Sequence, residues 1–123
     1  FIKGLGAVHA MSHAAGRIER LNLHHGTLNA VFLPAVLRFN APECELKYER
    51  LRRTIGLTPH ADLAEAVTKM NVNIGLPSGL KALGIGEADI PDLINYAKRD
   101  LSALTNPRKV TDVDFEAMIR ETF

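Results

Sequence analysis

Apolar residues recur at intervals of three and four along most of this chain, and that spacing predicts amphipathic α-helices. Strong helix formers and few β-branched residues predict a first helix from Gly6 to about Arg20. A second helix is predicted from about Thr27 to Phe39, where the residues are apolar almost all round, as in a buried helix. Pro34 should bend it, because proline removes one hydrogen bond to the preceding turn.

The middle of the chain predicts two shorter helices. One runs from Glu43 to Thr54, with Leu46 and Leu51 facing inward. The next begins at Thr58-Pro59, where the threonine acts as N-cap and the proline takes the first helical position. The residues of this helix that we expect to be buried are Leu63, Ala66, Val67, Met70 and Ile74.

Glycine and proline divide the last third of the chain. Residues Gly75 to Gly86 predict a loop with a short helical turn at Leu80–Leu83, and Pro91 opens a helix that Asn106-Pro107 ends. Thr111 caps the last helix. The expected buried faces are Leu93, Ile94, Ala97 and Leu101, then Phe115, Met118 and Ile119. No segment favours a strand, so the expected fold class is all-α, a helical bundle-like domain of five or six helices.

Composition excludes several classes of protein. The chain has 123 residues, the size of one domain, and a net charge of +1, so no global field attracts it to nucleic acid or to a membrane surface. No apolar stretch reaches the roughly 20 residues that cross a bilayer. A single cysteine, Cys44, rules out an internal disulfide framework and favours a cytoplasmic location.

Four of the five histidines lie between His9 and His25. His9 and His13 are four residues apart, so they share one face of the first predicted helix and could grip one metal ion. The alternative is that they are ordinary surface or packed histidines, since a bare pair at this spacing is common. Glu19 is the only acidic residue before Glu43, so few carboxylates are near to complete a site. Spacing alone leaves the question open.

The residues around these histidines form a motif that is more specific than their spacing. VHAMSHAAG is followed by HHGTLNAVFLPAVLRFN, and later by GLPSGLKALGIGEADIPDLINYAKRD and LTNPRKVTDVDFEAMI. The order of His-x-x-x-His, His-Gly-x-x-Asn-Ala and an apolar run with an internal proline closely resembles the iron-dependent, or group III, alcohol dehydrogenase family. The resemblance covers essentially all of residues 1–123. It implies the C-terminal part of that family's helical metal-binding domain, which has a dehydroquinate synthase-like fold.

The resemblance implies roles for three histidines. His9 and His25 match metal ligands of the family, and His13 matches a histidine beside the metal and the nicotinamide that helps to move a proton. His24 matches no functional position. The connection from Gly16 to His25 is slightly longer than in the family, so either His24 or His25 could be the ligand. His25 is preferred because the Gly-x-x-Asn-Ala that begins at Gly26 sets the register. Asp100 is expected to be a structural anchor. The implied metal is iron(II) or zinc, and neutral imidazole suits both.

The resemblance also implies that the chain is incomplete. It begins at Phe1, and neither the family's glycine-rich nucleotide loop nor its earlier Asp-x-x-x-His precedes His9. NAD or NADP would bind mainly to the absent N-terminal domain, so we expect this chain alone to be inactive. Loss of packing partners from the Thr27–Phe39 helix should expose an apolar patch, through which the chain would associate with its missing part or with itself. A homo-oligomer is therefore expected.

Three functions remain after this comparison. The first is an NAD(P)-linked alcohol dehydrogenase that interconverts small alcohols and aldehydes or ketones by hydride transfer. The second is a carbonyl reductase similar to maleylacetate reductase. The third is a helical binding module that has lost catalysis, against which the joint presence of His9, His13 and His25 argues.

Overall fold

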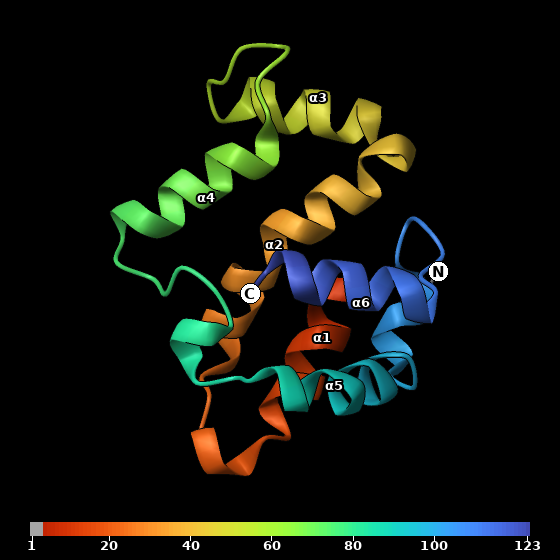
Figure 1. The fold of residues 1–123 in the computed structure, drawn as a ribbon. Helices are drawn as coiled ribbons and strands as arrows, with labels where there is room; N and C mark the ends of the chain where they lie inside the picture. The colour runs from red at the N-terminus through yellow and green to blue at the C-terminus, as the bar shows by residue number, and fades with distance from the viewer. Residues whose placement is uncertain (1–3) are drawn as a thin grey trace.

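Residues 4–123, which the computed structural model describes, fold into six α-helices joined by 3₁₀ turns and loops, with no strand among them (Figure 1). This confirms the all-α prediction. No helix in this part of the chain combines the length and the apolar character needed to cross a lipid bilayer. The helices are α1 (Ala7–Gly16), α2 (His25–Asn40), α3 (Glu45–Thr54), α4 (Leu63–Asn73), α5 (Ile90–Ala97) and α6 (Asp112–Glu121).

Small side chains on α1 let its neighbours pack closely around it. The helix lies against both α2 and α5, and its alanines are buried at the contacts (Figure 1). Because alanine loses no side-chain entropy on burial, a short helix can be buried on most sides at little cost. The largest fully buried side chains of the surrounding core are Phe32, Phe115, Met11, Leu28, Leu80, Ile85, Leu93 and Ile119. They confirm that α2, α5 and α6 turn their predicted apolar faces inward.

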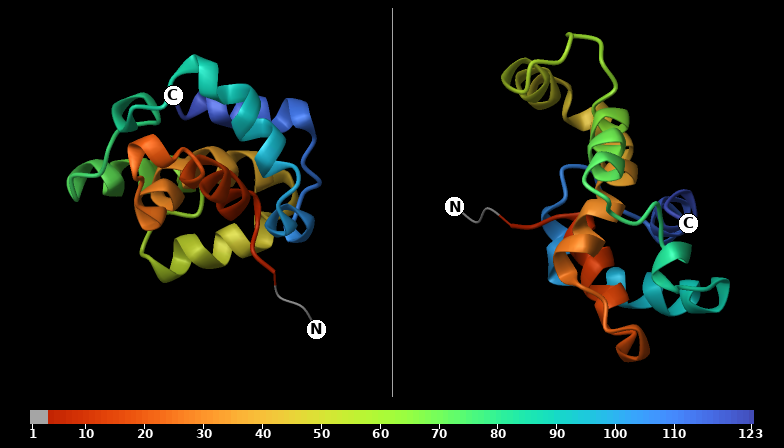
Figure 2. Two further views of the ribbon diagram at one scale, coloured as in Figure 1. Left: turned by 90° about the horizontal axis from the view of Figure 1, so that it is seen from below. Right: turned by 90° about the vertical axis from the view of Figure 1, so that its left-hand side faces the viewer.

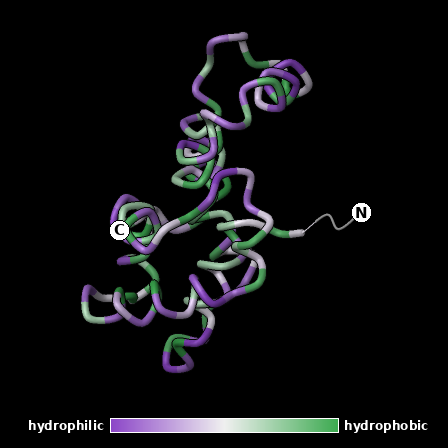
Figure 3. Tube along the Cα trace, turned by 90° about the vertical axis from the view of Figure 1, so that its right-hand side faces the viewer, coloured by the Kyte–Doolittle hydropathy of each residue, from purple (hydrophilic) through white to green (hydrophobic). Residues whose placement is uncertain are grey.

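A second, smaller core lies at one end of the molecule. There α3 projects from the end of α2, and α4 packs against α2, around buried Cys44, Tyr48 and Leu63 (Figures 1 and 2). Tyr48 donates a hydrogen bond to the carbonyl oxygen of Leu37 at 3.0 Å. Hydrophobic and hydrophilic segments alternate along the chain here as elsewhere (Figure 3). The smaller core contains fewer buried apolar residues than the main core, so fewer apolar contacts stabilise this end of the molecule.

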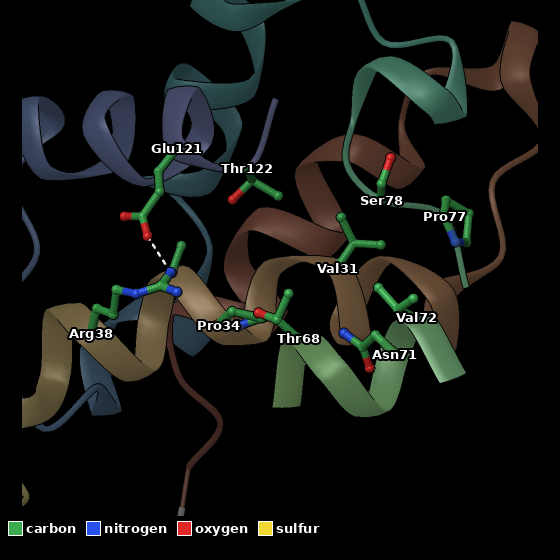
Figure 4. Close-up of a pocket in the computed structure, with 11 residues that line it drawn as sticks. Val31, Pro34, Arg38, Thr68, Asn71, Val72, Pro77, Ser78, Glu121 and Thr122 are labelled. Carbon is green, nitrogen blue, oxygen red and sulfur yellow. Dashed lines mark hydrogen bonds and ion pairs between the residues drawn. The ribbon is translucent and has the colours of Figure 1, made fainter. Parts of the chain in front are cut away.

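Pro34 lies inside α2, and α4 supplies the hydrogen bond that the proline removes. The carbonyl of Ala30 lacks its usual donor four residues later, and the side-chain amide of Asn71 donates to it at 2.8 Å. A cleft of about 260 Å³ lies between α2, α4 and the end of α6, and an ion pair of Arg38 with Glu121 borders it (Figure 4). None of the histidines lines this cleft.

The side chain of Asn106 joins three distant parts of the chain. Its amide oxygen accepts hydrogen bonds from the backbone N–H of Ala7 and from the amide of Asn40, both at 3.1 Å. Its amide nitrogen donates to the oxygen of Asn40 at 2.7 Å and to the carbonyl of Arg108 at 2.6 Å. The first turn of α1, the end of α2 and the segment before α6 are therefore held at one point.

Several helix boundaries differ from the prediction. The first helix ends at Gly16, not at Arg20, and Glu19–Leu21 form a 3₁₀ turn before Asn22 adopts a left-handed conformation with φ 46°. Glycine is a weak helix former, and the left-handed residue redirects the chain toward α2. The fourth helix is capped by Asp62, whose carboxylate accepts from the N–H of Glu65, and not by Thr58.

Several residues predicted to be buried are exposed. Leu46 is 75% exposed and Leu101 is 78% exposed, and the other wrong predictions are Leu51, Met70 and Ile74. The helix before Leu101 ends at Ala97, so this residue falls in a 3₁₀ turn. For the others, helical periodicity identifies an apolar face, but residues 4–123 provide no element to cover it. These exposed residues lie outside α2, the helix expected to lose its packing partners, so the apolar patch expected there and the self-association both stay predictions.

We predict that Asn106→Ala lowers the free energy of unfolding of this chain by about 1 to 3 kcal/mol, because buried polar groups of α1 and of Asn40 lose their partner. Urea titration followed by circular dichroism measures the change. Asn73→Ala is the matched control, because Asn73 is exposed at the end of α4. Equal stability of the two variants would refute the role of Asn106.

Candidate active site

Three imidazole rings meet where α1 lies beside the start of α2. His9 and His13 project from one face of α1, and His25 is the first residue of α2. The ring of His25 lies 5.3 Å from that of His9 and 5.2 Å from that of His13, measured between centroids. The rings of His9 and His13 are 5.8 Å apart. The structure thus brings together the three histidines that the sequence selected.

His24 has a different position from His25. It is the N-cap of α2, and its Nδ1 accepts a hydrogen bond from the backbone N–H of Thr27 at 3.4 Å. A Cβ added to Gly26 would lie 3.2 Å from the His24 ring, so the glycine leaves room for this cap. The resemblance matched His24 to no functional position, and the helix cap is the structural role that it has.

Asp100 orients the ring of His13. Its carboxylate lies 2.9 Å from His13 Nδ1, and its other oxygen accepts from the backbone N–H of Ser102 at 2.8 Å. Burial alone would raise the pKa of Asp100, but hydrogen bonds from Ser102 and His13 outweigh it and hold the pKa below its ordinary value of 3.8. We expected only a structural anchor here, and no local signal linked residues 87 positions apart.

Asn29 supports the ring of His25 from one turn further along α2. Its amide nitrogen lies 3.2 Å from His25 Nε2, so the amide donates to that nitrogen. The amide oxygen of Asn29 is buried and has no hydrogen-bond partner within residues 4–123. A buried, unsatisfied oxygen is costly, and it leaves this residue able to accept a bond from a further group.

The three imidazoles also affect one another electrostatically. Burial lowers the pKa of His9 below its ordinary value of 6.5, and His25 and His13 lower it further against the opposing effect of Asp100. The folded chain therefore binds fewer protons than the unfolded chain when the pH falls below 6.5. The contribution of His9 to the free energy of unfolding is therefore fully present above pH 6.5, and it is lost as the pH falls through the lowered pKa of the folded chain.

The donor set fits one side of a metal site. Neutral imidazole is the form that binds iron(II) or zinc, and the lowered pKa keeps His9 in that form at neutral pH. Within residues 4–123, however, no three His, Cys, Asp or Glu side chains are arranged to enclose a metal ion. His13 Nδ1 is directed to Asp100 and His25 Nε2 to Asn29, so each of these two rings keeps one nitrogen for another partner. A metal ion held here would need further ligands.

Other candidate residues lie apart from this cluster. His60 is exposed and borders a hollow between α3 and α4, and buried Cys44 belongs to the smaller core. Neither contributes to the histidine cluster. A broad apolar groove of about 690 Å³ does reach it, since His9 and Asn29 line that groove together with Leu33 and Leu37.

The sequence of the whole region settles the family. Residues 2–123 match the model of the Fe-containing alcohol dehydrogenase family, C-terminal. The chain belongs to the iron-containing alcohol dehydrogenase family. Members of this family therefore provide the context in which the three histidines are interpreted below.

Curated relatives resemble this chain in sequence, and solved structures resemble it in fold. It is 43% identical to 4-hydroxybutyrate dehydrogenase of Cupriavidus necator, over 99% of this chain and 34% of that protein. The crystal structure of a 1,3-propanediol oxidoreductase superposes with a TM-score of 0.85 at 35% identity, over 97% of this chain and 33% of that one.

A sulfoacetaldehyde reductase from Bifidobacterium kashiwanohense, solved in complex with NAD⁺, superposes with a TM-score of 0.80 at 26% identity. It is matched over 95% of this chain and 30% of its own length. The chain thus spans about a third of the length of the relatives it matches.

We predict that NMR titration of the metal-free chain gives a His9 midpoint below 6.5, and that His25→Gln moves it upward, because one neighbouring positive charge is removed. His60→Gln serves as the control, since His60 is remote from the cluster and should leave the midpoint unchanged. A His9 midpoint at or above 6.5 in the unaltered chain would show that the rings do not share this environment.

Proposed function

We propose that this chain is the C-terminal helical part of a longer NAD(P)-linked, metal-dependent alcohol dehydrogenase. The enzyme would interconvert small alcohols and aldehydes or ketones by hydride transfer. The observation that carries the proposal is the meeting of His9, His13 and His25 at one point, with ring centroids 5.2 to 5.8 Å apart. Packing alone does not need three polar rings in contact on a partly exposed surface.

His9 and His25 are the residues that would hold the metal, one from α1 and one from α2. When bound, a divalent ion supplies Lewis acidity at the alcohol oxygen, and a nicotinamide nucleotide supplies the hydride acceptor. The buried run of α2 that follows His25 keeps one wall of this region dry. Fixed charges act more strongly when water is excluded.

His13 would hold and move the proton of the alcohol. With Asp100 accepting from Nδ1–H, the opposite nitrogen, Nε2, is left with a free lone pair. A carboxylate in this position also fixes the plane of the ring and stabilises its protonated form. These are the properties of a general base that takes a proton and returns it in the reverse reaction.

The remaining parts of the enzyme lie outside this chain in the proposal. The nucleotide would bind mainly to an N-terminal domain, and further metal ligands would come from a preceding helix. The apolar groove beside His9 is a natural surface for that missing part, since its lining includes half-buried Leu33 and Leu37 of α2 and exposed Leu51 of α3. The chain alone is therefore expected to be inactive.

A first test is to read the coding sequence upstream of Phe1. A glycine-rich nucleotide loop and an Asp-x-x-x-His in frame would support the dehydrogenase. A start codon directly upstream would favour the non-catalytic module instead. A maleylacetate reductase-like activity would show itself in a preference for reducing an unsaturated keto acid.

We predict that, in the complete protein loaded with iron(II), His13→Asn lowers kcat for alcohol oxidation by about 100- to 10,000-fold, the range expected for loss of a general base. Metal content should stay unchanged, because His13 is not one of the two proposed ligands. His24→Asn is the control and should keep activity near that of the unaltered enzyme. Full activity of His13→Asn would contradict the assigned role.

A further inference from the structure

An open hollow of about 510 Å³ lies beside His13, where the end of α1 faces the end of α5. It is separate from the apolar groove on the other side of the histidine cluster, and the two share no lining residue. Its lining is mainly polar and charged. The residues that line it are His13, Arg17, Tyr96, Arg99, Asp100 and Leu101.

Arg17 continues the row of functional side chains along α1. It follows His13 by four residues, as His13 follows His9, so the three lie in succession along one face. Its guanidinium lies over the ring of Tyr96, 4.7 Å from the ring centroid. This cation–π contact restricts the long side chain and leaves its N–H donors free to bind a ligand.

The two arginines of the hollow have no acidic partner within the part of the chain described here. Four arginines elsewhere are ion-paired, as Arg20 is with Asp89 at 2.8 Å, whereas Arg17 and Arg99, like Arg50, Arg52 and Arg108, have no carboxylate within 4.0 Å among the described residues. The nearby carboxylate of Asp100 is already bonded to His13 and to the N–H of Ser102. Two positive charges therefore border the hollow without neutralisation.

We propose that this hollow is an anion subsite that binds the terminal carboxylate of a short hydroxy acid or aldehyde acid. The other end of that substrate would react beside His13, so the proposal rests on the proposed function. Side chains four residues apart on a helix have Cβ atoms about 6 Å apart, which is the span of a short carbon chain. Arginine is suited to the carboxylate because its planar N–H groups match the two oxygens.

The test compares two substrates of equal chain length in the complete enzyme, 4-hydroxybutyrate and 1-butanol. Arg17→Met should lower the ratio of their kcat/KM values by about 10- to 100-fold, the effect expected when a charge-assisted hydrogen bond is lost. Arg99→Met should shift the ratio in the same direction, and it leaves the stacking on Tyr96 intact. Arg50→Met is the matched control, because Arg50 is exposed on α3, and it should keep the ratio.

Binding provides a second readout that needs no turnover. Calorimetric titration of succinate into the complete protein without nucleotide should detect binding in the unaltered and Arg50→Met forms. That binding should weaken by about 10- to 100-fold in Arg17→Met. Titration of 1,4-butanediol should show no such dependence on Arg17, because it carries no charge.

The outcomes separate the subsite from the proposed function. If Arg17→Met and Arg99→Met reduce both substrates equally, the arginines are structural and the proposal is overturned. If they raise KM for the nucleotide and keep the substrate ratio, the anion is a nucleotide phosphate and the proposal is overturned. If the protein oxidises no alcohol but succinate binding depends on Arg17, the anion subsite stands and the proposed function fails.

Discussion

The amide group of Asn106 fixes the start of α1, and the arrangement of the histidines depends on that position. One oxygen accepts from the first N–H of α1 and from Asn40 at the end of α2, so the two helices share an anchor. An α-helix is rigid over three turns, so a fixed start determines where residues two and six positions later point. His9 and His13 face His25 because the small side chains of α1 then allow close contact with α2.

Much of this arrangement could be predicted from local sequence. Helical spacing placed His9 and His13 on one face, and the sequence context selected His25 over His24. The N-cap Thr111 followed from side-chain chemistry that acts within one turn. Such features depend on neighbours in the sequence, which is why a single chain reveals them.

The remaining features depend on residues that only the fold brings together. Asp100 reaches His13 across 87 positions, and Asn71 reaches Ala30 across 41. No periodicity encodes either contact. Leu46 and Met70 were wrongly predicted to be buried, because an apolar stripe does not show whether a partner exists to cover it. Asp62 replaced Thr58 as a cap because several polar residues compete for that position in one short segment.

The site is asymmetric, and this asymmetry suits an enzyme that is completed by another part of the chain. One side of the histidine cluster opens on an apolar groove and the other on a hollow with two unpaired arginines. In the proposal His9 and His25 provide nitrogen donors, His13 is held by Asp100, and no three His, Cys, Asp or Glu side chains within residues 4–123 could enclose a metal ion by themselves. Family membership and this geometry agree with the proposed alcohol dehydrogenase, whose chemistry would be shared between two domains.

Calorimetric titration of zinc into the 123-residue chain tests the central claim, that His9 and His25 form half of a metal site. Half of a metal site should bind zinc with micromolar or weaker affinity. A complete structural zinc site is worth roughly 10–16 kcal/mol, and two imidazoles supply far less. Binding should vanish in His9→Ala and in His25→Ala but persist in His24→Ala. Zinc binding that survives His9→Ala, or that is lost in His24→Ala, would show that His9 and His25 do not form this half-site.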